Sequence, residues 1–154
     1  MKLELLGYQR ESVDFAKKTP YCILALEMGL GKSLISLKAA IELKTKTLII
    51  CPSYIALNWQ SEIAKFFPDK VVSLLRHKKE FYFPVDSDFV IITYSFLPEA
   101  DILFEWADTV ILDEVHYLKS MNAKRTEAAH RLIYENSISR VIMLTGTPIL
   151  NRVY

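Results

Sequence analysis

The feature that most constrains the fold is an alternation of short apolar runs with longer amphipathic segments. Six runs of about five residues are rich in Val, Ile and Leu, and most of them are apolar at consecutive positions. Consecutive apolar residues are typical of strands that are buried on both faces of a parallel sheet. The predicted strands are 22–26, 47–51, 71–75, 89–93, 109–113 and 140–144.

The segments between these runs repeat their apolar residues at helical spacing. In 54–67, for example, Ile55, Trp59 and Ile63 fall on one side of a helix, where we expect them to join the core. This alternation predicts an α/β fold with a mostly parallel central sheet and helices on both faces. The irregular stretch 76–88 is predicted to be a surface connection that includes a short extra strand at "EFYF". The predicted helices are 5–18, 33–43, 54–67 and 123–136.

Length and composition fit one domain with a packed core. The 154 residues are 51% hydrophobic and carry a net charge of +1, so any surface for nucleic acid must be local. The apolar runs are far shorter than the roughly 20 residues of a membrane helix, and the N-terminus does not resemble a signal peptide. We therefore expect no membrane partner and an intracellular location. Cys22 and Cys51 adjoin apolar runs and are predicted to be buried, reduced thiols.

A glycine-rich turn joins the first predicted strand to the helix that follows it. The stretch "EMGLGKS" contains Gly29, Gly31, Lys32 and Ser33. Glycines permit a positive φ, and the amides at a helix N-terminus form a concavity that suits phosphate. Lys32 can then reach the β- and γ-phosphates of ATP, and the Ser33 hydroxyl can ligate Mg²⁺. A complete P-loop has glycine where this chain has Leu26, so the turn alone also allows an ordinary strand–helix connection.

Two adjacent carboxylates, Asp113 and Glu114, end another apolar run in "VILDEVH". Open α/β sheets bind ligands at the carboxyl ends of their strands, and burying two acids there is costly without a cation. One carboxylate can hold the Mg²⁺ shell while its neighbour orients the attacking water. We predict that Asp113, Glu114 and Lys32 are catalytic in the attack of water on a bound phosphate and that Ser33 and Asp113 face the metal.

A third polar turn, "TGTP", ends the last predicted strand. Thr145, Gly146 and Thr147 lead into Pro148. Their hydroxyls could link the acidic strand to groups across the cleft. Alone, the segment is equally compatible with a plain turn.

In this order and spacing, "GLGKS", "DEVH" and "TGTP" resemble the first RecA-like lobe of superfamily 2 helicases. The closest resemblance is to the Swi/Snf-type, DEAH-box-containing translocases of double-stranded DNA, and it covers nearly the whole chain, from about Leu5 to Arg152. It implies a RecA-like P-loop domain, ATP and Mg²⁺ as cofactors, and nucleic acid, most specifically double-stranded DNA, as partner. Members usually carry Asp at the position of Leu26, which is therefore a departure from that pattern as well.

The resemblance also implies roles for individual residues. Gln9 of "GYQRESV" matches the motif that reads adenine, and His116 ends the DExH box, which it couples to the other lobe. The nucleotide-binding residues implied are Gln9, Gly29, Leu30, Gly31, Lys32, Ser33, Leu34 and His116. The nucleic-acid contacts implied by motifs Ia and Ib are Pro52, Ser53, Thr93 and Tyr94. Basic residues that could contact phosphates are Lys44, Lys46, Arg76, Lys78, Lys79, Lys119, Lys124 and Arg125.

A motor of this family has a second RecA-like lobe, which carries arginine fingers. Residues 1–154 correspond to the first, ATP-binding lobe only, so we interpret the sequence as a piece of a longer motor, with a motor split over two chains as the alternative. In GTPases an arginine finger is worth roughly 10³–10⁵ in kcat. We therefore expect this chain alone to bind ATP weakly and to hydrolyse it little.

Three other functions compete with this interpretation. A DExH RNA helicase lobe would share the acid motif, but "EMGLGKS" and "TGTP" favour duplex DNA. A non-catalytic module that binds DNA or a protein partner is favoured by Leu26, whereas the presence of Lys32, Ser33, Asp113 and Glu114 counts against it. A small P-loop kinase usually keeps the first glycine and has no reason to carry a DExH box.

Overall fold

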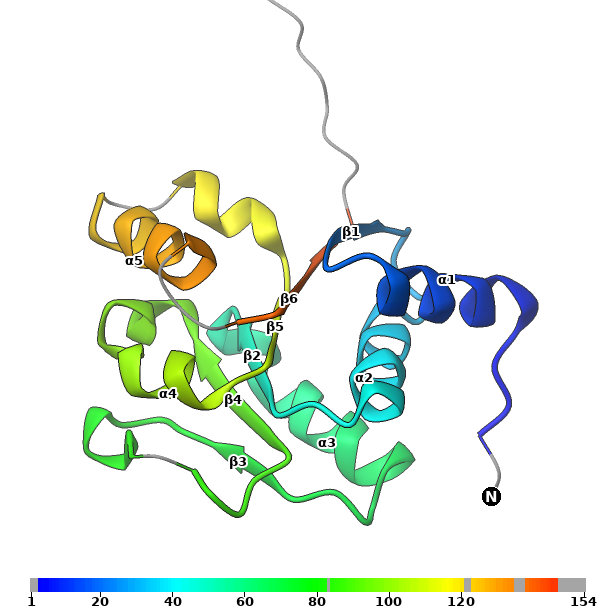
Figure 1. The fold of residues 1–154 in the computed structure, drawn as a ribbon, viewed down its shortest axis with the longest axis horizontal. Coiled ribbons are helices and arrows are strands. Elements are labelled where there is room, and N and C mark those ends of the chain that lie inside the picture. Colours follow the sequence, from blue (N-terminus) through cyan, green and yellow to red (C-terminus); the bar gives the residue numbers. More distant parts are fainter. Residues whose placement is uncertain (1–2, 83, 121–122, 135–137, 147–154) are drawn as a thin grey trace, which may run out of the picture.

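Six parallel strands form one sheet in the computed structural model, which describes residues 3–82, 84–120, 123–134 and 138–146 (Figure 1). The strand order is β1-β6-β5-β2-β4-β3, and every strand pair in these residues is parallel. The mostly parallel sheet is therefore confirmed. The strands are β1 (Tyr21–Ala25), β2 (Thr47–Cys51), β3 (Val72–Leu74), β4 (Phe89–Thr93), β5 (Thr109–Leu112) and β6 (Arg140–Thr145).

The four predicted helices are present, with ends shifted by a few residues. A fifth helix, α4, was not predicted, because it is short and follows a 3₁₀ segment (Tyr94–Glu99) that contains Pro98. The extra strand at "EFYF" is wrong for the described residues 80–82. There the Glu80 carboxylate accepts hydrogen bonds from the backbone N–H groups of Arg76 and His77, which turns the chain. The helices are α1 (Gly7–Lys18), α2 (Lys32–Leu43), α3 (Ala56–Phe66), α4 (Asp101–Trp106) and α5 (Ala123–Tyr134).

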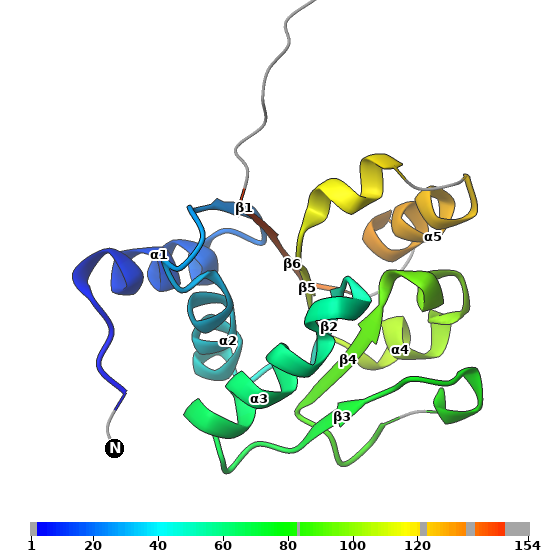
Figure 2. The same cartoon turned by 180° about the vertical axis from the view of Figure 1, so that it is seen from behind.

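The two faces of the sheet carry separate apolar clusters. On β2, Ile49 and Cys51 pack into the cluster that includes residues of α1, α2 and α3. Leu48 and Ile50 alternate with them and pack into the cluster that includes residues of α4 and α5. Figures 1 and 2 show the same division, with α1, α2 and α3 on one side of the strands and α4 and α5 on the other. The consecutive apolar positions therefore correspond to a sheet that is covered on both faces.

The two cysteines are free and buried, as predicted. Burial raises the pKa of the Cys51 thiol to about 12 and also raises the pKa of the Cys22 thiol. Among the described residues, every helix is too short or too polar to cross a bilayer.

The parallel arrangement sets the position of the candidate site. Because all six strands run the same way, their carboxyl ends meet at one edge of the sheet. The loop after β1, the start of α3 after β2, the turn after β4 and the acid motif after β5 all begin at that edge.

Candidate nucleotide site

The glycine-rich loop after β1 has the backbone that the sequence predicts. Gly29 and Gly31 have φ values of 83° and 82°, a region that residues with a Cβ rarely adopt. A Cβ on Gly31 would also lie 2.7 Å from Nε2 of Gln9, whereas nothing lies within 4 Å of one on Gly29. The backbone conformation therefore favours glycine at both positions, and a Cβ on Gly31 would also have to displace the end of the Gln9 side chain.

Lys32 begins α2 and folds back over its own loop. Its Nζ donates to the backbone carbonyls of Leu26 at 2.7 Å and Glu27 at 3.1 Å. The Leu26 side chain packs against the core cluster of α1, α2 and α3. The residue that departs from the usual P-loop therefore places its side chain against the core, and its carbonyl helps to hold the lysine.

The start of α1 contacts the same loop. The Tyr8 hydroxyl donates to the Leu30 carbonyl at 3.0 Å, and Nε2 of Gln9 lies 3.4 Å from that oxygen. Oε1 of Gln9 accepts from the backbone N–H of Leu6 at 3.0 Å, and the side chain is nearly buried. Gln9 thus connects its own helix to the loop, and adenine recognition by this residue stays a prediction.

Asp113 follows β5 and is held by three donors. Its Oδ2 accepts from Nε1 of Trp59 at 2.8 Å, and its Oδ1 accepts from the backbone N–H of Glu114 at 2.8 Å. The Tyr94 hydroxyl donates to the backbone carbonyl of Asp113 at 2.6 Å. Burial raises the pKa of the Asp113 carboxyl, and the hydrogen bonds from Trp59 and Glu114 oppose that rise. The acid motif is therefore a buried carboxylate in one fixed orientation.

Glu114 and His116 form the rest of the DExH box. Glu114 has a φ of 49°, a left-handed conformation that costs a non-glycine residue about 1–2 kcal/mol. Its Oε2 lies 3.1 Å from Nδ1 of the exposed His116. Backbone strain of this kind concentrates at functional sites, where the surrounding structure holds it in place.

One cavity of about 190 Å³ brings the two predicted motifs together. Lys32 and Ser33 line it from the loop side, and Asp113 and Glu114 line it from the acid side. The positive charge of Lys32 is near enough to oppose the rise in the pKa of Asp113 that burial causes. The complete lining is Met28, Gly29, Lys32, Ser33, Ile55, Asn58, Trp59, Glu62, Asp113 and Glu114.

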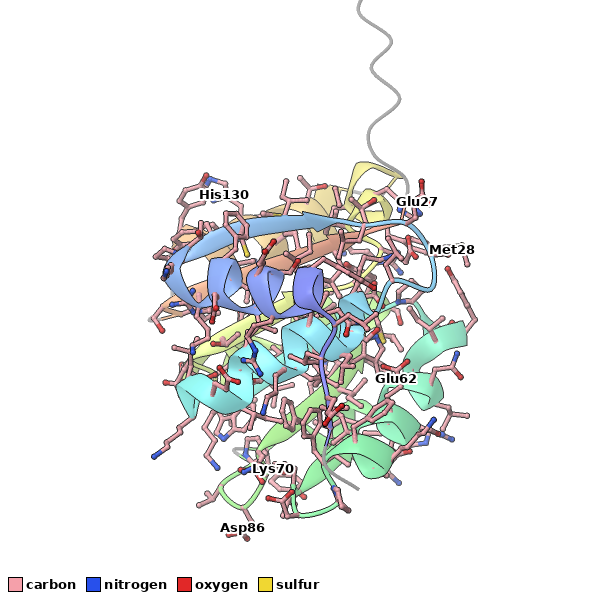
Figure 3. The ribbon with its side chains drawn as sticks, turned by 90° about the vertical axis from the view of Figure 1, so that its right-hand side faces the viewer. Glu27, Met28, Glu62, Lys70, Asp86 and His130 are labelled. Atoms are coloured by element: carbon pink, nitrogen blue, oxygen red, sulfur yellow. The ribbon has the colours of Figure 1, made fainter. Side chains whose placement is uncertain are left out.

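Two polar residues of this cavity, Asn58 and Glu62 of α3, carry no role predicted from the sequence. Met28 and Glu62 are labelled in Figure 3, on the loop after β1 and on α3 respectively. Burial raises the pKa of the Glu62 carboxyl, and the Asp113 charge raises it further. Asn58 and Glu62 are four residues apart in "NWQSE", and this spacing could have indicated a shared helix face.

The oxygen donors of the cavity fit Mg²⁺ bound together with a nucleotide. Mg²⁺ in phosphate sites usually takes one or two carboxylates, and substrate phosphates and water complete its shell. Ser33 and Asp113 supply a hydroxyl and a carboxylate. No group of three or more His, Cys, Asp or Glu residues in the described part of the chain could hold a metal by itself.

Other predicted residues are distributed around this edge. Leu34 packs against the core cluster of α1, α2 and α3, and Leu30 offers its carbonyl to Tyr8. A Cβ on Gly146 would lie 3.7 Å from Nζ of Lys32, so the "TGTP" turn adjoins the loop. Thr147 lies outside the described residues, as does the side chain of Lys119.

The predicted nucleic-acid contacts separate into two groups. Ser53 and Thr93 line a second cavity, of about 410 Å³, together with Arg76 and Ser95. The Thr93 and Ser95 hydroxyls are 2.7 Å apart. Pro52 and Tyr94 are buried instead. The remaining lining of this cavity is apolar: Ala56, Leu57, Leu74, Leu75 and Phe96.

The chain is similar to known proteins along nearly its whole length. The family described as "SNF2-related domain" matches residues 8–154. The human "DNA annealing helicase and endonuclease ZRANB3" is 30% identical over 164 residues, which cover 99% of this chain and 15% of that protein. A Caenorhabditis elegans "SWI/SNF-related matrix-associated actin-dependent regulator of chromatin subfamily A-like protein 1 homolog" is 35% identical over 156 residues, with coverages of 96% and 22%.

A solved structure described as "Sulfolobus solfataricus SWI2/SNF2 ATPase core in complex with dsDNA" superimposes with a TM-score of 0.84 at 28% identity. The match covers 99% of this chain and 34% of that one. The fold therefore matches the RecA-like fold of that ATPase core. The chain spans only a minor part of the length of each of these relatives.

Proposed function

Because this chain belongs to the SNF2-related family, we propose that it is the ATP-binding lobe of a DNA translocase or helicase. The single observation that carries the proposal is the cavity shared by Lys32 and Ser33 of the loop with Asp113 and Glu114 of the acid motif. In the longer protein, a second RecA-like lobe would supply the arginines that complete ATP hydrolysis. We propose an intracellular location, since such a motor acts on DNA.

Each group in the cavity has a distinct task in this proposal. Lys32 exchanges the two loop carbonyls for oxygens of the β- and γ-phosphates, so its ammonium group keeps hydrogen-bond acceptors throughout. Ser33 and Asp113 would hold Mg²⁺, which would neutralise phosphate charge. Glu114 orients the water that attacks the γ-phosphorus and accepts its proton as ADP leaves.

Duplex DNA is the proposed partner. The support is the second cavity, where Ser53, Thr93 and Arg76 lie at the carboxyl ends of neighbouring strands. Hydroxyls and a guanidinium suit the phosphate backbone, which carries no sequence information, as motion along DNA requires. The related archaeal core is described in complex with double-stranded DNA.

Nucleotide titration of this chain and its Lys32→Ala variant tests the proposal. We expect the variant to bind Mg·ATP roughly 10- to 100-fold more weakly, because a hydrogen bond to a charged group contributes about 1.5–3 kcal/mol. Fluorescence of a labelled ATP analogue measures both affinities. Lys18→Ala is the matched control, since Lys18 is exposed on α1 and does not line the cavity.

Equal affinity of the wild type and Lys32→Ala would contradict a phosphate-binding loop and favour a non-catalytic module. A drop with Lys18→Ala as large as that with Lys32→Ala would show that net charge, and not the loop, controls binding. Affinity that falls only in Lys32→Ala supports the proposal.

An Arg76→Gln variant tests the DNA partner. If Arg76 contacts a phosphate, the variant binds duplex DNA more weakly, and the slope of log affinity against log salt becomes shallower by about 1. Fluorescence anisotropy with a labelled duplex at several salt concentrations gives the slope. Lys79→Gln is the control, because Lys79 is exposed but does not line the second cavity. An unchanged slope in Arg76→Gln would remove Arg76 from the proposed interface.

A further inference from the structure

Trp59 is buried, and a hydropathy pattern assigns it only to the core. Its side chain nevertheless makes a polar contact. The side chain is only 2% exposed, yet its Nε1 lies 2.8 Å from Oδ2 of Asp113. An indole has a single N–H donor, and here that donor is directed at a carboxylate inside the protein. Such charge-assisted hydrogen bonds are about twice as strong as neutral ones.

The remaining contacts fix Asp113 from other directions. Oδ1 accepts from the backbone N–H of Glu114, and the backbone carbonyl accepts from the buried Tyr94 hydroxyl. The Tyr94 ring stacks on Tyr117, with centroids 5.9 Å apart and planes 9° apart. A carboxylate has about four lone-pair sites, so each oxygen of Asp113 keeps capacity for a further ligand.

The helix that carries Trp59 touches both sides of the nucleotide cavity. Glu62 lies nearly one turn after Trp59, and both residues line the cavity with Ser33 and Asp113. The 3₁₀ segment Ser53–Ile55 runs directly into this helix, and Ser53 lines the second cavity. α3 is thus one rigid element between the proposed DNA-facing residues and the acid motif.

We propose that Trp59 is a positioning residue that orients the Asp113 carboxylate for Mg²⁺ and thereby sets the affinity for the metal–nucleotide complex. The inference rests on the proposed function, because it takes Asp113 as a magnesium ligand. Hydrogen bonds to ligating carboxylates and histidines typically contribute 10- to 100-fold to metal affinity or activity. A tryptophan that only filled the core would contribute no such dependence on the metal.

The test is ADP binding by the 154-residue chain in Mg²⁺ and in EDTA, for the wild type and Trp59→Phe. Phenylalanine keeps an aromatic ring in the core but removes the N–H donor. We expect the gain in affinity from Mg²⁺ to shrink by roughly 10- to 100-fold, while affinity in EDTA stays the same because the loop is intact. Trp106→Phe is the matched control, since Trp106 is 6% exposed and packs in the cluster on the opposite face of the sheet.

The outcomes separate the inference from the proposed function. A wild type that binds no nucleotide in either condition overturns both. A wild type whose binding tightens with Mg²⁺, and a Trp59→Phe variant that tightens equally, overturn the inference alone. A reduced gain in Trp59→Phe but not in Trp106→Phe supports it.

A second measurement does not depend on the folding of Trp59→Phe. In the Trp106→Phe variant, Trp59 is the single tryptophan, because the chain has two. Mg·ADP should then change the Trp59 emission spectrum, since a cation on Asp113 alters the group to which the indole donates. ADP in EDTA should leave that spectrum unchanged. Identical spectra in the two conditions would overturn the inference.

Discussion

The two sides of the nucleotide cavity are built in different ways. On the loop side, Lys32 binds carbonyls of its own loop, and the Leu30 carbonyl accepts from the partly exposed Tyr8. On the acid side, Asp113 is 8% exposed and is held by Trp59 and Tyr94, two buried side chains from other elements. The loop-side contacts are exposed or partly buried, whereas the side chains of Trp59 and Tyr94 make buried contacts on the acid side.

This difference matters for how the site could work. The carbonyls that hold Lys32 can be replaced by phosphate oxygens, so the loop side can rearrange when a ligand binds. The contacts of Asp113 leave lone pairs free and need no rearrangement before a cation binds. A preorganised acid side costs little reorganisation at the moment of reaction, which is the usual basis of electrostatic catalysis.

The largest expected effect is a loss of stability in alanine variants of the two loop-side glycines, and it should differ between them. Gly31→Ala should lower the free energy of unfolding by about 3 kcal/mol, from about 1–2 kcal/mol of left-handed strain plus the contact with Nε2 of Gln9. Gly29→Ala has nearly the same φ but open space, so we expect only the strain of about 1–2 kcal/mol. Urea unfolding of both variants measures the difference.

Equal losses in the two variants would mean that the Gln9 side chain moves aside freely. Gln9→Ala is the control background, because Gly31→Ala made in it keeps the strain and lacks the contact. We expect Gly31→Ala to cost less stability in the Gln9→Ala background than in the wild type.

The sheet and the meeting of the two motifs could be predicted from the sequence. Consecutive apolar residues such as Leu48 and Ile49 require a strand with two covered faces, which implies parallel strands joined by helices. Parallel strands bring their carboxyl ends to one edge, so both motifs were expected at that edge. The strand order, which the sequence did not predict, leaves only β6 between β1 and β5 and so brings Lys32 and Asp113 into one cavity.

The contacts that hold Asp113 could not be predicted in the same way. Trp59 was correctly assigned to the core, but hydropathy does not reveal the direction of one N–H. Tyr94 was assigned to nucleic acid from its motif, whereas its hydroxyl points to the Asp113 carbonyl. Both contacts depend on how α3 and the turn after β4 are rotated against β5, and that rotation is decided by tertiary packing.

One tyrosine on each side of the cavity donates a hydrogen bond to a backbone carbonyl, so the same Tyr→Phe change can be made on both sides. Tyr94→Phe leaves a buried carbonyl without its donor, so we expect a loss of about 1.5 kcal/mol in the free energy of unfolding. Tyr8→Phe removes an exposed hydrogen bond that water can replace, so we expect less than about 0.5 kcal/mol. Chemical unfolding of the two variants, each compared with the wild type, measures both. Similar losses would contradict the contrast between a buried acid side and an accessible loop side.

An effect smaller than that of Tyr94→Phe is expected from the ion pairs that join the two helices of the loop side. Glu42 of α2 accepts hydrogen bonds from Lys17 and Arg10 of α1, each at 2.8 Å, and these bonds lower the pKa of Glu42 to about 2. A carboxylate whose folded pKa is depressed contributes stability above its unfolded pKa of about 4.5 and loses it as the pH falls towards 2. Arg10 is 45% exposed, so Glu42→Gln should cost only about 0.5–1 kcal/mol at pH 7.

Salt and pH distinguish the stability contribution of Glu42 on the loop side from that of the Tyr94 hydroxyl on the acid side. The difference between Glu42→Gln and the wild type should disappear between pH 4.5 and 2 and should shrink in 1 M salt, where the Debye length is about 3 Å. The loss caused by Tyr94→Phe should not change with salt, because a neutral hydroxyl and a carbonyl form that buried bond. Unfolding midpoints across pH and salt measure both variants. If the Glu42→Gln difference survives in 1 M salt, the ion pairs are shielded from solvent, and the loop side is less accessible than its contacts indicate.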